Sequence, residues 1–231
     1  MELKICWFYP ELMTLYGDKG NIDTLKYRCE KRNIQCIVDT CSFKEEKDLL
    51  SYDLLIIGGA CENAFILNDL KERINDFKAY IESGKFLLLL CGGYQIFGQS
   101  FMDSNNKVYE GLKLLPYTST LDQQMIGDIV LSVKLQDEEI YVVGFENHKS
   151  ITTDITKPFG NKINGKGMEG YLDNNILGTY LHGPLLPKNP KVCDYIILNA
   201  LKNKGLTSLC QIDDTIEEKA LETVLKIFKV K

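Results

Sequence analysis

Cys91 stands at the end of a strongly apolar run and directly before two glycines, in the stretch GKFLLLLCGGYQIFG (84–98). A short run of this kind is typical of a buried strand, which would place the thiol at the carboxyl end of that strand. If a helix begins near Tyr94, the cysteine lies in a strand–turn–helix elbow, where unpaired N–H groups and the positive end of the helix lower the pKa of a thiol and stabilise an oxyanion. A packing role is more common for a buried cysteine. The glycine pair, however, lets backbone donors and a substrate approach, so we predict a nucleophile.

A cysteine nucleophile needs a base, and the sequence has two histidines. His182 lies in GTYLHGP, at the end of an expected strand and before a Gly-Pro turn, while His148 lies in GFENH, also at an expected strand end. A lone histidine is more often a satisfied polar residue than a base. Together with the elbow cysteine, the pattern predicts His182 as the base and His148 as part of the lining of the substrate pocket.

Alternating strands and helices predict the scaffold of this site. The expected strands of the first half are 3–9, 34–39, 53–59 and 85–90, and the expected helices are 21–33 and 68–84. Uniformly apolar strands separated by helices indicate a parallel sheet covered on both faces. In the second half, we expect an antiparallel pair at 128–135 and 139–148, a strand at 174–183, and closing helices at 189–205 and 214–230. This order predicts one doubly wound α/β domain over 1–231, with a mainly parallel sheet and an antiparallel extension, and ligands bind at strand ends in such sheets.

Composition narrows the class of protein. The chain has 231 residues, a net charge of −5, 45% hydrophobic and 26% charged residues, which is ordinary for a soluble globular domain and unfavourable for binding nucleic acid. We expect no membrane span, because no uncharged apolar window is long enough, and no signal peptide, which favours a cytoplasmic location. The eight cysteines form no C-x-x-C pair, so we expect no metal site and, apart from Cys91, reduced cysteines buried as small hydrophobes.

Four motifs, in this order along the chain, resemble those of a known family. They are LYGDKGNI (15–22), LLLLCGGYQIFG (87–98), GFENH (144–148) and GTYLHGPLLPKNP (178–190). Together they are similar to segments of the class I (triad) glutamine amidotransferases, in the branch related to cobyric acid synthase. The first motif narrows the resemblance to the glutaminase subunits of bacterial lipid II isoglutaminyl synthases. The resemblance covers most of the chain and implies the flavodoxin-like fold of that class.

The resemblance also implies a reaction. The Cys91 thiolate would attack the side-chain amide carbon of L-glutamine, and His182 would activate the thiol and protonate the leaving ammonia. Backbone N–H groups of Gly92 and Gly59 would hold the oxyanion, and Gln95 would line the glutamine pocket. Water would then release glutamate from the thioester.

A synthetase partner is implied as well. It would resemble a Mur ligase, form a heterodimer with this chain, and use ATP and magnesium to activate the α-carboxylate of the D-glutamate in the peptidoglycan stem of lipid II. Ammonia would convert that residue to D-isoglutamine. The sequence contains no G-x-x-x-x-G-K-[ST] loop, so we expect no cofactor in this chain and ATP chemistry in the partner.

The chain departs from the family pattern in two places. Triad amidotransferases commonly carry a glutamate two residues after the histidine, where this chain has Pro184. Either the cysteine and histidine work as a dyad or the partner supplies the acid, and we predict the second. In addition, Ala60 and Cys61 follow the glycine pair, where relatives frequently have a longer glycine run. This departure weakens the support for Gly59 as an oxyanion donor. For Cys61 we expect a packing role.

The anchor for the α-carboxylate of glutamine stays open between several polar residues. In DQQMIGDIV (122–130), where a basic residue would be useful, the sequence has Gln123 and Gln124. We name Gln124, Asn147 and His148 as candidates, with Lys149 beside them, and set against them the possibility that QQMIGD (123–128) is a solvated turn before a strand.

Two further segments and the function itself allow more than one interpretation. The loop 17–20 is an anion site or, as we prefer, a helix-entry turn capped by Asn21 and available to the partner. The apolar stripe of 214–230 is expected to dock on the protein's own sheet. Other functions that fit are a glutaminase for a cobyric-acid-type cofactor, a cysteine hydrolase on the same scaffold, or a redox-sensing protein in which Cys91 is oxidised reversibly.

Overall fold

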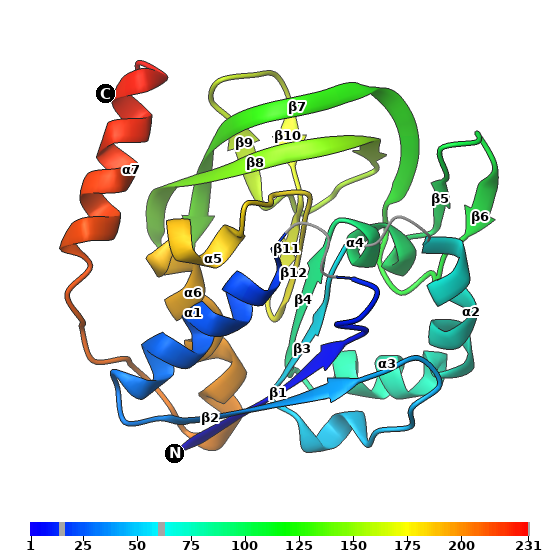
Figure 1. The fold of residues 1–231 in the computed structure, drawn as a ribbon, viewed down its shortest axis with the longest axis horizontal. Coiled ribbons are helices and arrows are strands. Elements are labelled where there is room, and N and C mark those ends of the chain that lie inside the picture. Colours follow the sequence, from blue (N-terminus) through cyan, green and yellow to red (C-terminus); the bar gives the residue numbers. More distant parts are fainter. Residues whose placement is uncertain (14–16, 60–62, 231) are drawn as a thin grey trace.

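The computed structural model describes residues 1–13, 17–59 and 63–230, arranged around two six-stranded sheets (Figure 1). The first sheet has the strand order β11-β12-β4-β3-β1-β2. Its strands are β1 (Glu2–Phe8), β2 (Gln35–Cys41), β3 (Leu54–Ile57), β4 (Phe86–Leu90), β11 (Tyr171–Asp173) and β12 (Ile176–Thr179). All pairs in it are parallel except β11 with β12. The predicted parallel sheet is confirmed, with an antiparallel strand added at one edge.

Helices cover both faces of this sheet, as uniformly apolar strands require. One face carries α1 (Lys19–Glu30), α5 (Leu185–Lys188) and α6 (Pro190–Leu201), and the other carries α2 (Asn63–Glu72), α3 (Ile74–Glu82) and α4 (Gly92–Phe97). Alternate residues of β1 divide between the two cores: Leu3 and Ile5 pack on the first, Cys6 and Phe8 on the second. Two short 3₁₀ helices, η1 (Leu49–Ser51) and η2 (Lys202–Lys204), complete this layer.

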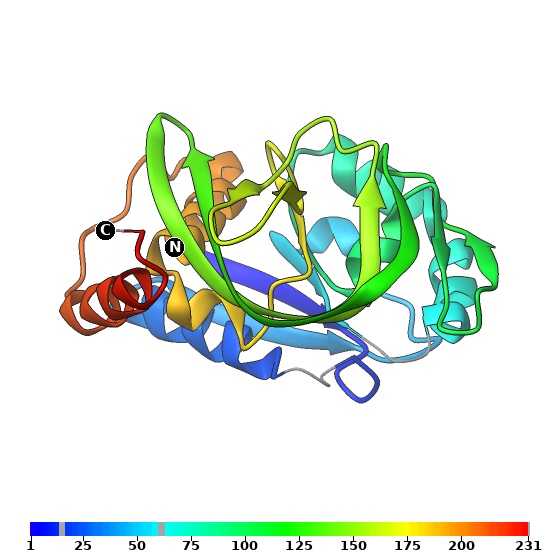
Figure 2. The same cartoon turned by 90° about the horizontal axis from the view of Figure 1, so that it is seen from above.

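The antiparallel part forms a sheet of its own. Its strands are β5 (Ser100–Met102), β6 (Val108–Glu110), β7 (Thr118–Leu135), β8 (Glu138–Thr153), β9 (Gly160–Lys162) and β10 (Met168–Glu169). The long hairpin β7–β8 bends into a bow, seen clearly from above in Figure 2. Three residues after the end of β12, the backbone of His182 pairs with Phe145 of β8. The bow therefore passes over the carboxyl edge of the parallel sheet.

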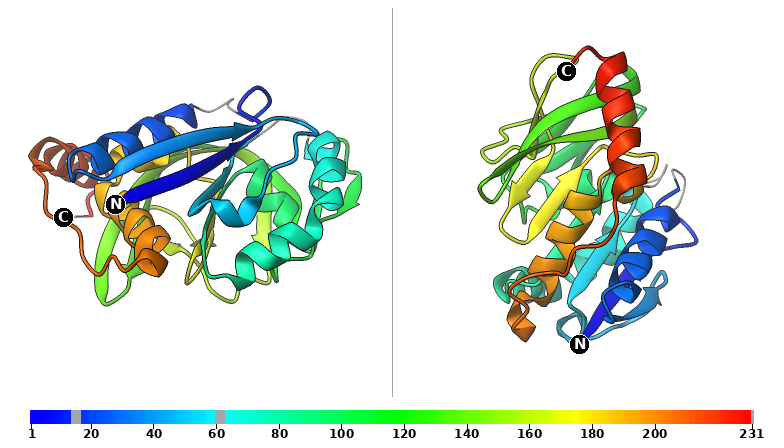
Figure 3. Two further views of the ribbon diagram at one scale, coloured as in Figure 1. Left: turned by 90° about the horizontal axis from the view of Figure 1, so that it is seen from below. Right: turned by 90° about the vertical axis from the view of Figure 1, so that its left-hand side faces the viewer.

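The last helix, α7 (Thr215–Ile227), lies along the bow, as the right-hand view of Figure 3 shows. Leu225 is buried against Val130 and Val143, with further α7 side chains packed around them. The expected docking on the protein's own sheet is confirmed for this part of the stripe. Ile216, at the start of the helix, is 80% exposed and takes no part in it.

The structure corrects two predicted elements. The helix expected at 68–84 is two helices that meet at Arg73, whose backbone is not helical (φ −105°, ψ 16°). Its guanidinium pairs with Asp69 of the preceding turn at 3.4 Å and donates to the Cys41 sulfur at 3.1 Å, a contact that no local pattern reveals. The cap predicted at Asn21 is also wrong, because α1 begins at Lys19 and Asn21 is a buried residue of its first turn.

Among the described residues, no helix has both the length and the apolar character that crossing a bilayer demands.

A buried arginine ties three elements together and yields a stability prediction. Arg28 of α1 is 2% exposed and binds Asp194 of α6 (Nε–Oδ1 2.6 Å) and Asp214, which precedes α7 (Nη1–Oδ1 2.6 Å). Without Arg28, Asp214 loses its ion-pair partner while Asp194 keeps Arg32 (2.7 Å), so Arg28→Ala is expected to lower the free energy of unfolding by about 3 kcal/mol. Urea denaturation measures this. Lys19→Ala, which breaks only an exposed ion pair with Asp23, should cost at most about 1 kcal/mol, and equal losses in the two variants would contradict the prediction.

Candidate active site

Cys91 occupies a strained turn between β4 and α4. Its backbone has φ 47° and ψ −103°, a conformation that costs free energy in a non-glycine residue and is kept only where neighbours enforce it. Its N–H donates to Thr179 O of the adjacent strand (2.9 Å), and its carbonyl accepts from Gln95 N–H (3.0 Å). The predicted strand–turn–helix elbow is therefore present, and α4 begins at Gly92, two residues earlier than expected.

Glycines allow the strand ends to approach this turn closely. Gly93 N–H donates to Gly58 O at 3.0 Å, and a Cβ at Gly93 would lie 2.6 Å from Ile57 O. A Cβ at Gly59 would lie 3.0 Å from the Cys91 Cβ, 3.6 Å from its Sγ, and 3.6 Å from the His182 Cε1. Three residues predicted for the reaction, Gly59, Cys91 and His182, thus meet at one point, since β3, β4 and β12 are adjacent parallel strands that end at the same edge.

His182 is buried beside the thiol. It is 2% exposed, and its backbone is fixed by two hydrogen bonds to Phe145 (2.9 and 3.2 Å). Burial, and to a lesser extent the neighbouring His148, lowers the pKa of His182 to about 4. The imidazole is therefore neutral at pH 7, which is the state that a base needs in order to accept the thiol proton.

Gln95 and His148 gather around Tyr180, next to the nucleophile. Gln95 Nε2 donates to Ser150 Oγ at 2.6 Å, and Tyr180 hydrogen-bonds to Gln95. The His148 ring stacks on Tyr180 with centroids 4.1 Å apart, and its Nδ1 lies 2.8 Å from Ser150 O. His148 lies within β8, not at a strand end as predicted. The four side chains form a buried polar wall beside Cys91.

Gln124 and Asn147 lie apart from this wall. Gln124 Nε2 donates to Asn147 Oδ1 at 3.2 Å across the β7–β8 hairpin, at an exposed position. Because side chains alternate along a strand, Asn147 points to the opposite face of β8 from His148. The solvated turn considered for 123–128 is wrong: these residues belong to β7, with a register shift between Leu121 and Met125. Cys61 lies outside the described residues.

Sequence reasoning missed Tyr180, Ser150, Glu169 and Asp18. Glu169, 3% exposed, accepts hydrogen bonds from Tyr180 N–H (2.7 Å) and Thr179 Oγ1 (2.9 Å), and so fixes the segment that leads to His182. The carboxylate of Asp18 accepts from Gly59 N–H at 3.2 Å. Tyr180 and Asp18 lie inside quoted motifs, which was the available signal. Ser150 and Glu169 had none.

A fully buried carboxyl group gives a second stability prediction. Burial raises the pKa of Glu169 to about 7, partly offset by its two hydrogen bonds. A raised carboxyl pKa contributes stability at low pH that is lost as pH rises from 4.5 through 7, in total about 3 kcal/mol. Glu169→Gln cannot ionise, so its free energy of unfolding relative to wild type should rise by that amount over this range. Exposed Glu222→Gln is the control, and a pH-independent difference for Glu169→Gln would contradict the assignment.

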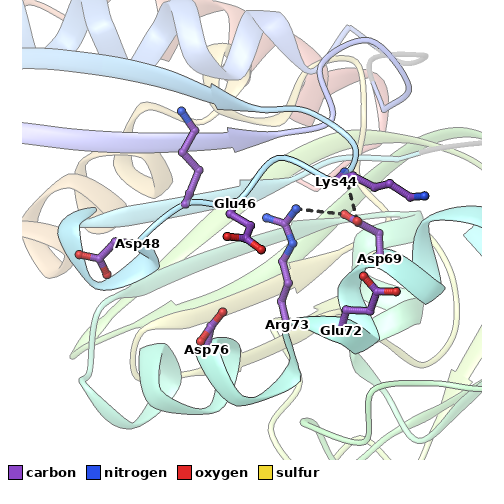
Figure 4. Close-up of a pocket in the computed structure, with 8 residues that line it drawn as sticks. Lys44, Glu46, Asp48, Asp69, Glu72, Arg73 and Asp76 are labelled. Carbon is purple, nitrogen blue, oxygen red and sulfur yellow. Dashed lines mark hydrogen bonds and ion pairs between the residues drawn. The ribbon is translucent and has the colours of Figure 1, made fainter.

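A charged cleft apart from Cys91 is an alternative candidate for a binding site. Its volume is about 660 Å³, and Figure 4 shows Lys44, Asp69, Glu72 and Arg73 in its lining. Acidic side chains outnumber basic ones in this lining, and Asp69 pairs with Arg73 within it. None of the residues predicted for the reaction lines it. A cavity of about 360 Å³ includes His148, Ser150 and Tyr180 in its wall, whereas Cys91 and His182 do not line it, so it adjoins the polar wall and not the thiol itself.

Comparisons with known proteins agree with this geometry. The family model described as CobB/CobQ-like glutamine amidotransferase domain matches residues 4–190. The chain is 36% identical to the lipid II isoglutaminyl synthase (glutamine-hydrolyzing) subunit GatD of Streptococcus pneumoniae, over 88% of this chain and 82% of that protein. It is 35% identical to the subunit of the same name from Staphylococcus aureus, over 97% and 95%. A cobyric acid synthase of Thermodesulfovibrio yellowstonii is 30% identical over 62% of this chain but only 31% of its own length.

Solved structures support the fold. The crystal structure of a glutamine amidotransferase from Thermotoga maritima aligns with a TM-score of 0.55 over 98% of this chain and 93% of that chain, at 13% identity. The resemblance read from the motifs and the fold class are confirmed. The chain belongs to the CobB/CobQ-like glutamine amidotransferase family.

Proposed function

We propose that this chain hydrolyses L-glutamine to glutamate and ammonia through a thioester on Cys91. The observation that carries the proposal is the convergence of the strained Cys91 turn with buried His182 beside Gly59. A nucleophile on a sharp turn, a neutral base next to it and a glycine-lined approach are the parts that acyl transfer requires.

Cys91, His182 and one water molecule supply every bond change and proton transfer that the reaction requires. His182 takes the Cys91 thiol proton as sulfur bonds to the amide carbon of glutamine, and the oxyanion is held by backbone N–H groups, with Gly92 and Gly59 as our candidates. His182 then gives the proton to the amide nitrogen, the C–N bond breaks and ammonia leaves. Water, deprotonated by His182, attacks the thioester, and glutamate departs as the thiol is restored.

The residues that would bind the substrate are inferred from their positions relative to Cys91. We propose that Gln95 and His148 bind the glutamine body; their position in the wall beside Cys91 and the family position that Gln95 matches support this. Gln124 and Asn147 are our candidates for a more exposed contact, for example with the α-carboxylate as glutamine enters. They supply hydrogen-bond donors without a positive charge.

For the acceptor, we propose lipid II, amidated on the D-glutamate of its stem by a Mur-ligase-like synthetase that forms a heterodimer with this chain in the cytoplasm. Two relatives that the chain matches over most of their length are named as subunits of lipid II isoglutaminyl synthase. The match to the Thermodesulfovibrio cobyric acid synthase covers 31% of that protein, which favours the cell-wall acceptor over a corrinoid acid. ATP and magnesium would belong to the partner, and this chain would need no cofactor.

We propose further that the partner supplies the carboxylate that orients His182. Position 184, which bears this acid in many triad enzymes, is a proline packed over α1: a Cβ at Gly20 would lie 2.4 Å from Pro184 Cγ. The acid of a triad holds the imidazole in the reactive orientation. Glutamine hydrolysis should therefore rise strongly when the synthetase is added, and full activity in the isolated chain would contradict this.

Nitrogen tracing tests the function and its acceptor together. The complex is given glutamine labelled with heavy nitrogen at the side-chain amide, ATP, magnesium and lipid II. Label in D-isoglutamine, absent with Cys91→Ala, is the expected result. Label in a corrinoid acid offered instead would establish the cofactor alternative, and hydrolysis of other amides without transfer would indicate a cysteine hydrolase.

A further inference from the structure

The peptide unit between Gly58 and Gly59 is held from both sides. Its carbonyl accepts from Gly93 N–H at 3.0 Å, and its N–H donates to Asp18 Oδ2 at 3.2 Å. This N–H is the group that the family resemblance suggests for binding the oxyanion. In the isolated chain it is directed to a side-chain carboxylate of this same protein.

Asp18 is placed for this contact at the expense of another. It is the residue before α1, where an aspartate ordinarily accepts hydrogen bonds from its own helix, but its side chain makes no such bond. It is 1% exposed. Gly58 makes room for it, since a Cβ there would lie 2.6 Å from Asp18 Oδ2 and 2.4 Å from Met13 O. Instead of capping its own helix, the side chain reaches the loop beside Cys91.

An N–H bonded to a carboxylate is not available to a substrate oxyanion, and the negative charge of that carboxylate opposes a second one nearby. We propose that Asp18 is a positioning residue that keeps the Gly59 N–H turned away from the thioester site in the isolated chain, and that its release completes the oxyanion site. The inference rests on the proposed glutaminase function and adds a second level of control to it.

The surroundings of Asp18 connect it to the segment behind the base. In the first turn of α1, Gly20 packs against Pro184 and Asn21 Oδ1 accepts from Leu186 N–H at 2.8 Å. Gly183, next to His182, is exposed, as is Lys19. A synthetase that contacts the exposed Gly183, next to His182, would lie close to the helix start that carries Asp18.

Hydration of the carboxylate offsets part of the cost of breaking its bond to Gly59. Burial raises the pKa of Asp18 to about 6, although the Gly59 N–H partly offsets the shift. The ionised form is thus less stable in this site than in water. A small movement of α1 that admits water to Asp18 would recover that free energy.

The test measures ammonia release from L-glutamine by the isolated chain and by the complex, for wild type, Asp18→Ala and Asp18→Asn. An oxyanion donor is worth about a hundredfold or more in kcat, so Asp18→Ala is expected to raise the kcat of the isolated chain about a hundredfold with KM unchanged. Asp18→Asn keeps a neutral acceptor and should give a smaller rise. Asp23→Asn, on the exposed side of α1 and bonded to Lys19, is the matched control and should behave as wild type.

A purely structural role for Asp18 predicts the opposite, a loss of activity with lower thermal stability. Folded Asp18 variants that are no faster than wild type in isolation would overturn the proposal, and if Asp18→Ala does not fold, Asp18→Asn decides. A wild-type complex without Cys91-dependent activity would instead refute the proposed function, so the two failures are distinguishable.

Discussion

Replacing Cys91 by alanine is expected to lower the kcat of glutamine hydrolysis by about a millionfold, as removal of the nucleophile does in other acyl-transfer enzymes. The structure gives the reason. The thiol lies on a turn with φ 47°, against Gly59 and His182, and alanine keeps the turn and the base but has no atom to carry the acyl group. Ammonia release by the complex, with saturating glutamine, measures the loss.

Cys210→Ala is the matched control, because Cys210 is an exposed cysteine remote in sequence from the motifs. It should retain wild-type activity. Substantial hydrolysis by Cys91→Ala, with the fold intact by circular dichroism, would show that this thiol is not the nucleophile.

His182→Asn is expected to reduce kcat about as much as Cys91→Ala, and the double variant no further, because groups that act in one step are not additive. Asparagine fills much of the same volume and keeps the backbone pairing with Phe145. A double variant far slower than either single variant would mean that the two residues act independently.

The pH profile tests His182 without a substitution. Its pKa of about 4, lowered by burial, keeps the base neutral below the value of about 6.5 at which an ordinary histidine gains its proton. In the isolated chain, kcat/KM should therefore show no loss on the acid side until pH approaches 4. A carboxylate brought by the partner would raise this pKa, so the acid limb should move to higher pH in the complex. An acid limb near 6.5 in both forms would contradict the account.

Much of the scaffold could be predicted because buried parallel strands are uniformly apolar and glycines mark their ends. Strands β1, β2, β3 and β4 lie where the runs 3–9, 34–39, 53–59 and 85–90 indicated. The break at Arg73 could not be foreseen, since neither a proline nor a glycine marks it, and the contact of Arg73 with Cys41 of β2 joins residues distant in sequence. Likewise, the outer half of β7 is polar and half-exposed, and locally such a segment is indistinguishable from a turn.

The candidate site divides in the same way. Cys91 and His182 follow from motifs, but the adjacency of β4 and β12 that joins them is a matter of sheet order, which periodicity leaves open. Glu169 and Ser150 lie on segments with no chemical pattern, and only three-dimensional contact with Thr179, Tyr180 and Gln95 gives them a role. The Asp18–Gly59 contact joins residues 41 positions apart in sequence.

If the Cys91 sulfur attacks the side-chain amide of glutamine, an acyl intermediate forms on this residue. Capture of that intermediate is the decisive experiment. The complex is mixed with L-glutamine, quenched in acid after a fraction of a turnover, digested and analysed by mass spectrometry. The account predicts one glutamyl group on the peptide that contains Cys91, labile to hydroxylamine as a thioester is, and absent from Cys91→Ala. Glutamate production at the normal rate with no acyl group on that peptide, or with the group on another residue, would contradict it.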